Sequence, residues 1–195
     1  IARPEIRLTM LDSTGKKLAF VSQSVEELGL SANIVHARAE EAGQGELRES
    51  FDFAVSRAVA AMNILCEYCL PFVKVGGTFC AMKGAKGAEE LDCAGKAIAT
   101  LGGETQKTET LILPDSGERV LINVKKISHT ATKYPRPSYN GEKLPNGSFL
   151  PDRKQWTTAF SGDMLLSQRK GGSSIIGKDK CHGSFKSRSC SAHSC

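Results

Sequence analysis

Hydrophobic and polar positions in residues 6–126 alternate between short apolar runs and longer stretches with helical periodicity. Short apolar runs bounded by turn residues are typical of buried strands, and apolar residues spaced three and four apart are typical of helices. The runs predict strands at 6–11, 33–36, 51–56, 78–82, 108–113 and 119–125. The helical pattern covers 15–28, 60–72 and 86–101.

This order of elements predicts an α/β fold. Strands that alternate with helices favour a doubly wound, mostly parallel sheet. The last two strands are joined by Pro114–Gly117, which has the composition of a hairpin turn and predicts an antiparallel edge. The polar segment 40–50 is expected to be a loop with one helical turn, and Lys74–Gly77 is expected to be a turn.

The periodic pattern stops near Tyr134, which divides the chain into two regions. Residues 1–136 are predicted to form the folded domain. Residues 137–195 form a basic, Gly/Ser-rich tail with one short apolar run at Met164–Leu166, and we expect this tail to be disordered. Residues 1–136 carry 17 basic and 17 acidic residues, so the whole net charge of +5 comes from the tail. Any RNA contact on the folded domain must therefore be local.

Composition excludes several classes of protein. No apolar run approaches the roughly 18 residues of a membrane-spanning helix. The seven cysteines are odd in number and have no secretory context, so a disulfide framework is not expected. The pair Cys66 and Cys69 lies within an amphipathic run and is predicted to be core rather than a metal site. We expect a cytoplasmic, monomeric protein without a bound metal.

Polar side chains follow the predicted strands where each one ends. Asp12 follows the first strand, Glu40 lies just beyond the second, Arg57 follows the third and Lys83 ends the fourth. Ligands of doubly wound sheets bind at the carboxyl ends of the strands, where an acid can accept both ribose hydroxyls. Asp12 alone fits a helix cap equally well. Arg57 could instead form an ion pair with Glu40 or with Asp52. Together, these residues predict a site.

The segments that carry this site resemble a known family. They are Thr9–Lys17, Val35–Glu41, Phe51–Val59 and Gly76–Gly84, followed by Gly117–Ile122 and Tyr134–Arg136. In this order they are similar to the RsmG (GidB) family, bacterial 7-methylguanosine methyltransferases that act on small-subunit ribosomal RNA. The resemblance covers roughly residues 1–137 and implies a Rossmann-like class I methyltransferase fold.

The resemblance also implies a cofactor, S-adenosylmethionine, and a partner, the small-subunit (16S) ribosomal RNA. It places the cofactor's ribose near Asp12, its adenine beside Ala39 and Glu40, and Arg57 at the same site. It makes Lys83 a candidate for contact with RNA phosphate. Guanine N7 carries an exposed lone pair and needs no proton removed, so no general base and no catalytic residue in that sense is expected.

The chain departs from the family pattern at both ends. At the C-terminal end, family members usually end soon after the segment Tyr134–Arg136, whereas this sequence continues from Pro137 to Cys195. The family's first strand and glycine-rich loop would precede Ile1, so we expect an N-terminally truncated form whose sheet lacks a strand between 6–11 and 51–55. The alternative is a non-catalytic RNA-binding remnant that uses the basic tail. A dinucleotide-binding oxidoreductase would need a G-x-G-x-x-G motif after a strand, which the sequence does not contain.

Overall fold

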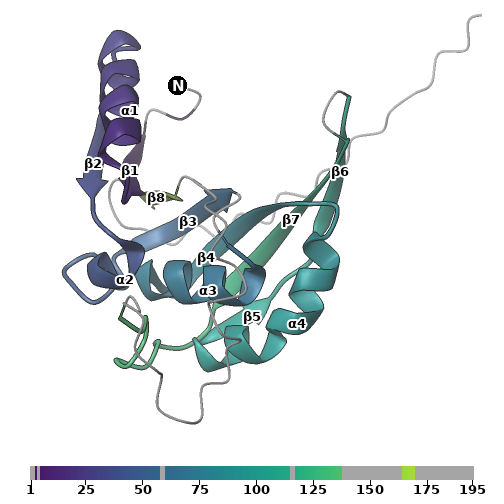
Figure 1. Cartoon of the computed structure of the whole chain (residues 1–195). Coiled ribbons are helices and arrows are strands. Elements are labelled where there is room, and N and C mark those ends of the chain that lie inside the picture. Colours follow the sequence, from purple (N-terminus) through teal and green to yellow (C-terminus); the bar gives the residue numbers. More distant parts are fainter. Residues whose placement is uncertain (1–2, 4, 58–59, 115–116, 138–163, 170–195) are drawn as a thin grey trace, which may run out of the picture.

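A computed structural model describes residues 3, 5–57, 60–114, 117–137 and 164–169 (Figure 1). The strands are β1 Ile6–Asp12, β2 Ala32–His36, β3 Phe51–Arg57, β4 Val73–Gly84, β5 Gly103–Thr105, β6 Glu109–Leu113, β7 Gly117–Lys126 and β8 Met164–Arg169. The α-helices are α1 Gly15–Glu27, α2 Ala39–Ala42, α3 Met62–Cys69 and α4 Gly87–Thr100. A 3-10 turn, η1 Leu70–Phe72, continues α3.

The strands form one sheet in the order β2-β1-β8-β3-β4-β7-β5, and β6 also pairs with β7. β1 pairs with β2 and β3 pairs with β4 in parallel, and each parallel partner is reached through helical crossovers. On the other side of β4, β7 pairs antiparallel with β4, β5 and β6. This is the predicted Rossmann-like, doubly wound sheet with an antiparallel edge.

β8 corrects two expectations. It lies within the segment predicted to be disordered, and it fills the central place predicted to lack a strand (Figure 1). β8 runs antiparallel to both neighbours, pairing with β1 from Ile6 to Leu11 and with β3 from Phe53 to Ser56. Its apolar residues Met164 and Leu166 are buried, which explains why so short a run is ordered. The other residues of the tail after Pro137 lie outside the described residues.

One face of the sheet carries the core. The pairing register puts Leu11, Met164, Ser56, Ala81 and Ile122 in one row across five strands, and all five are buried. Side chains alternate between the two faces of a strand, so this row shares one face. α3 and α4 cover that face at β3, β4 and β7, whereas α1 lies beside β1 and β2 (Figure 1).

Element boundaries differ from the prediction in three places. The predicted helix 60–72 ends as η1 because Pro71 removes a backbone donor. β4 begins at Val73, so the segment predicted as a turn belongs to the strand, with an irregular register. β5 is an additional short strand. It follows Gly102, whose φ of +80° and close approach to Ser128 leave no room for a side chain.

Candidate functional site

The ends of β1, β2 and β3 meet at one edge of the sheet, which we call the carboxyl edge. Leu11 of β1 and Ser56 of β3 both pair with Met164 of β8, so the two strands end at the same level. Asp12 and Arg57 follow by one residue, and both therefore point to the face opposite Leu11 and Ser56. Their backbones are separated by two strand spacings, roughly 10 Å. The structure brings these two predicted residues to the same edge and the same face.

Asp12 sits where β1 meets α1. Its Oδ1 accepts a hydrogen bond from the Thr14 amide at 2.6 Å, and its Oδ2 lies 3.3 Å from Lys17 Nζ. The carboxylate thus closes a short turn onto Thr14, the residue before α1, and is paired with a lysine of the first turn of the helix. A carboxylate has about four acceptor positions, so these two contacts leave capacity for a ligand hydroxyl. Thr14 is the N-cap residue of α1 and the helix has no side-chain cap hydrogen bond, so Asp12 is not its cap, and the ribose role stays a prediction.

The segment after β2 carries the next two predicted residues. The Ala37 amide donates to the Asp12 carbonyl at 3.3 Å, which ties this segment to the end of β1. α2 then begins at Ala39, which packs against the core, and Glu40 is only 8% exposed. The loop of 40–50 predicted to hold one helical turn does so, and that turn places Ala39 and Glu40 at the carboxyl edge.

Arg57 is exposed at the end of β3, opposite Met82 of β4. Asp52, one of the ion-pair partners considered for it, lies at the other end of β3 and forms an ion pair with Lys74 at 3.5 Å. An exposed guanidinium at the carboxyl edge is accessible to a ligand, and the predicted role in the cofactor site is compatible with this placement.

Lys83 lies on a different face from Arg57 and has a different environment. It is 7% exposed, and its Nζ lies 2.7 Å from Glu90 Oε2 and also donates to the Ala60 carbonyl. The same Glu90 oxygen accepts from the Met62 amide at 2.9 Å, so the pair holds the start of α3. The ammonium of Lys83 is engaged within the fold, and its placement gives no support to the predicted contact with RNA phosphate.

The cysteine pair on α3 is part of the core. Cys66 and Cys69 are fully buried, and burial raises the pKa of both thiols, that of Cys69 to about 12. Thiols with such raised pKa values are poor metal ligands and nucleophiles. Within the described ranges, no group of three or more His, Cys, Asp or Glu side chains is placed to hold a metal ion.

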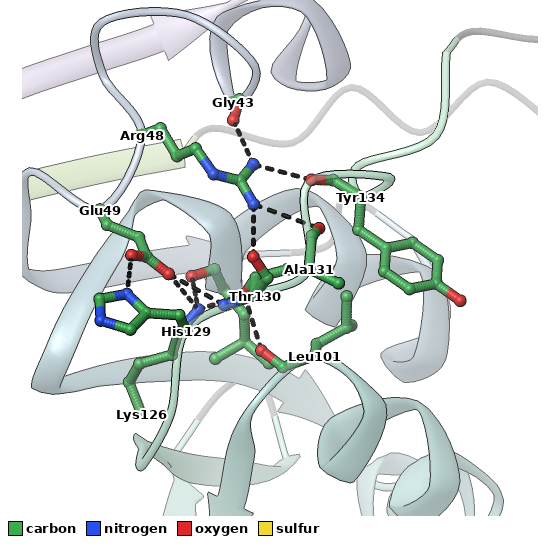
Figure 2. A network of polar contacts seen from close by, with 10 residues as sticks. Gly43, Arg48, Glu49, Leu101, Lys126, His129, Thr130, Ala131 and Tyr134 are labelled. Carbon is green, nitrogen blue, oxygen red and sulfur yellow. Dashed lines mark hydrogen bonds and ion pairs between the residues drawn. The ribbon is translucent and has the colours of Figure 1, made fainter.

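A polar network at the amino end of β3, the end opposite Arg57, was not predicted (Figure 2). It joins the loop after α2 to the segment after β7 through Arg48, Glu49, Lys126 and Thr130. Burial alone would raise the pKa of Glu49, but hydrogen bonds from His129 and Thr130, and the charge of Lys126, hold that pKa below its ordinary value. The signal in the sequence was slight, because each partner lies about 80 residues away along the chain.

Comparison with known proteins extends this picture. The curated relatives include the ribosomal RNA small subunit methyltransferase G of Lactobacillus acidophilus, 49% identical over 148 residues, and that of Brevibacillus brevis, 47% identical over 148 residues. Each alignment covers 74% of this chain and 62% of the relative, so the chain spans less than two thirds of the length of these relatives.

One solved structure is that of an rRNA methylase from Streptococcus thermophilus, with a TM-score of 0.46 and 16% identity, covering 60% of this chain and 72% of that chain. In the described part of the chain, no helix is long and apolar enough to span a bilayer. The family model described as GidB, rRNA small subunit methyltransferase G, matches residues 1–119, which include every predicted site residue. Since this match extends over more than half of the sequence, the chain belongs to the GidB family.

Proposed function

We propose that this chain acts in the S-adenosylmethionine-dependent methylation of guanine N7 in bacterial small-subunit (16S) ribosomal RNA. The observation that carries the proposal is the family match over residues 1–119, since it contains the three strand ends that meet at the carboxyl edge. The names of the curated relatives, which are ribosomal RNA methyltransferases, support the RNA substrate. A cytoplasmic location follows from that substrate.

The residues at the carboxyl edge fit the adenosyl part of the cofactor. Asp12 has acceptor capacity for the ribose hydroxyls, and the segment with Ala39 and Glu40 would lie along the adenine. Arg57 would contribute a positive charge beside the same ligand.

The reaction requires little acid–base chemistry from the protein. S-adenosylmethionine supplies an electrophilic methyl group, and guanine N7 already presents a lone pair. The protein's contribution is then to hold the two ligands in line and to exclude water from between them. The residues at the carboxyl edge orient the cofactor for this purpose, and none of them is assigned as a general base.

The proposal is tested by methyl transfer to unmethylated small-subunit RNA, with S-adenosylmethionine titrated to millimolar concentration. We expect 7-methylguanosine in the digested RNA, measured by mass spectrometry. Asp12→Asn should raise the KM for the cofactor about tenfold, the equivalent of losing about 1.4 kcal/mol of binding. Asp52→Asn, on the same sheet but at the opposite end of β3, should change that KM less than about twofold. Absence of any methylated guanosine would refute the proposal.

The alternative of a non-catalytic RNA-binding remnant rests on the basic tail. Most of that tail lies outside the described residues, and the described six residues of β8 are part of the sheet. No contact in the described residues favours this alternative over the methyltransferase.

A further inference from the structure

The placement of α2 depends on the loop that follows it. α2 is only four residues long, and a helix this short is not stable by itself. Its last turn closes through the Gly43 amide, which donates to the Ala39 carbonyl at 2.9 Å. The Gly43 carbonyl in turn accepts from Arg48 Nη1 at 3.0 Å. The end of α2 is therefore connected directly to the Arg48 guanidinium.

The same guanidinium reaches the segment after β7, residues 127–136, which we call the strap. Arg48 Nη1 donates to the Tyr134 carbonyl at 2.7 Å, and Nη2 donates to the carbonyls of Thr130 at 2.6 Å and Ala131 at 3.2 Å (Figure 2). Together with Gly43, four backbone carbonyls surround one cation. Only the planar fork of an arginine offers donors in enough directions to satisfy all four.

The strap is itself fixed to the core, so it can serve as an anchor. Arg136 forms a two-pronged ion pair with Glu67 of α3, with Nε–Oε1 at 2.9 Å and Nη2–Oε2 at 2.8 Å. Glu67 is fully buried, and this pair therefore cannot shift without exposing or orphaning a charge. Pro135 packs against Gly43, where an added Cβ would lie 3.1 Å from the proline ring.

We propose that Arg48 is a positioning residue for the cofactor site. By joining the end of α2 to the strap, it fixes the position and orientation of α2. The position of Ala39 and Glu40 at the carboxyl edge is fixed with it. This inference rests on the proposed function for its link to the cofactor, because the adenine contact of Ala39 and Glu40 belongs to that proposal. The mechanical part, that Arg48 holds α2 in place, is independent of it.

The test uses the full chain with Arg48→Met, which keeps an apolar stem but removes all donors, and Arg48→Lys, which keeps the charge. The readout is hydrogen exchange of the Ala42 and Gly43 amides, which close α2. We expect exchange about tenfold faster in Arg48→Met, corresponding to about 1.4 kcal/mol of lost local stability. Arg48→Lys should lie between this variant and the wild type. In both variants the KM for S-adenosylmethionine should rise while kcat changes less than about twofold.

Ile122→Val, which shortens a fully buried side chain on β7, serves as the control for a general loss of stability. It should cost about 1 kcal/mol of global stability without changing exchange at Ala42 and Gly43 relative to the rest of the sheet. Wild-type protection of these two amides in Arg48→Met would overturn the proposal. So would equal acceleration in Arg48→Met and Ile122→Val. If the amides lose protection but no variant, nor the wild type, binds the cofactor, the proposed function fails and the role of Arg48 in holding α2 stands.

Discussion

At the scale of single residues, the buried ion pair of Glu67 and Arg136 makes the sharpest prediction. Glu67 is fully buried and the Arg136 side chain is 20% exposed, so Glu67→Gln keeps the size of the buried side chain but removes the negative partner of a largely covered guanidinium. Removing one member of such a pair costs about 3–5 kcal/mol, so the free energy of unfolding in urea should fall by about 3 kcal/mol. Glu5→Gln breaks the exposed pair with Arg3 and should leave the free energy of unfolding unchanged within the error of the measurement. Similar losses in both variants would contradict this assignment.

Lys126 predicts a pH dependence of stability. Its ammonium is fully buried, and burial lowers its pKa to about 8, although Glu49 opposes the shift. The unfolded chain, with a lysine pKa near 10.4, then binds more protons between about pH 8 and pH 10. Stability carried by this group should therefore rise with pH across that window.

The comparison with Lys126→Met isolates this effect from cysteine and tyrosine ionisation. The wild-type free energy of unfolding minus that of the variant should increase by about 1–3 kcal/mol from pH 8 to pH 10, since one pKa unit corresponds to about 1.4 kcal/mol. Urea unfolding at a series of pH values measures it. A constant or falling difference would show that the Lys126 pKa is not lowered in the folded chain.

Sequence alone predicted which residues lie at the carboxyl edge but not the polar network at the amino end of β3. Asp12 and Arg57 could be found because each directly follows an apolar strand, and strand ends of a parallel sheet share an edge. Arg48 and Glu49 lie in a polar loop with no periodicity, and their partners in the strap lie about 80 residues away. Lys83 was assigned by its position in the pattern, which does not reveal that Glu90 would cover its ammonium.

At the scale of elements, the prediction to test is that β8 is buried in the sheet between β1 and β3. Leu166 is fully buried and pairs with Thr9 on one side and Ala54 on the other, whereas Leu165 points to the opposite face and is only partly buried. Leu166→Ala should lower the free energy of unfolding by about 2–5 kcal/mol and Leu165→Ala by clearly less. Equal effects on urea unfolding, or no effect of either, would mean that β8 does not occupy the centre of the sheet.

Periodicity predicted most elements because their apolar positions face one core. α1 and α4 begin and end within a residue or two of the prediction, as do β1 and β3. β5 is three residues long, too short to leave a pattern. β8 has only a short apolar run between polar residues. This run is buried because it lies between β1 and β3, two strands far away along the chain. The local sequence carries no information about that position.

At the scale of the whole molecule, the doubly wound class was predictable and the direction of the central strand was not. Alternating strands and helices restrict the connections to crossovers, and this leaves few topologies for β1–β4. β8 is connected through a long segment, so chain connectivity does not determine whether it enters parallel or antiparallel. In the described part of the sheet β8 lies between β1 and β3, and its pairing with both holds the strand ends that carry Asp12 and Arg57 in register.

β8 is an internal strand of the sheet and also the last described strand to be translated. While the nascent chain emerges, β1 and β3 are synthesised long before β8, the strand with which both of them pair. Their pairings with β8 form once residues 164–169 have been synthesised, across sequence separations of more than 100 residues. Pairings of such separation form slowly. Until these long-range pairings have formed, β1 and β3 lack the neighbour they share, and unpaired strand edges of this kind favour aggregation during folding.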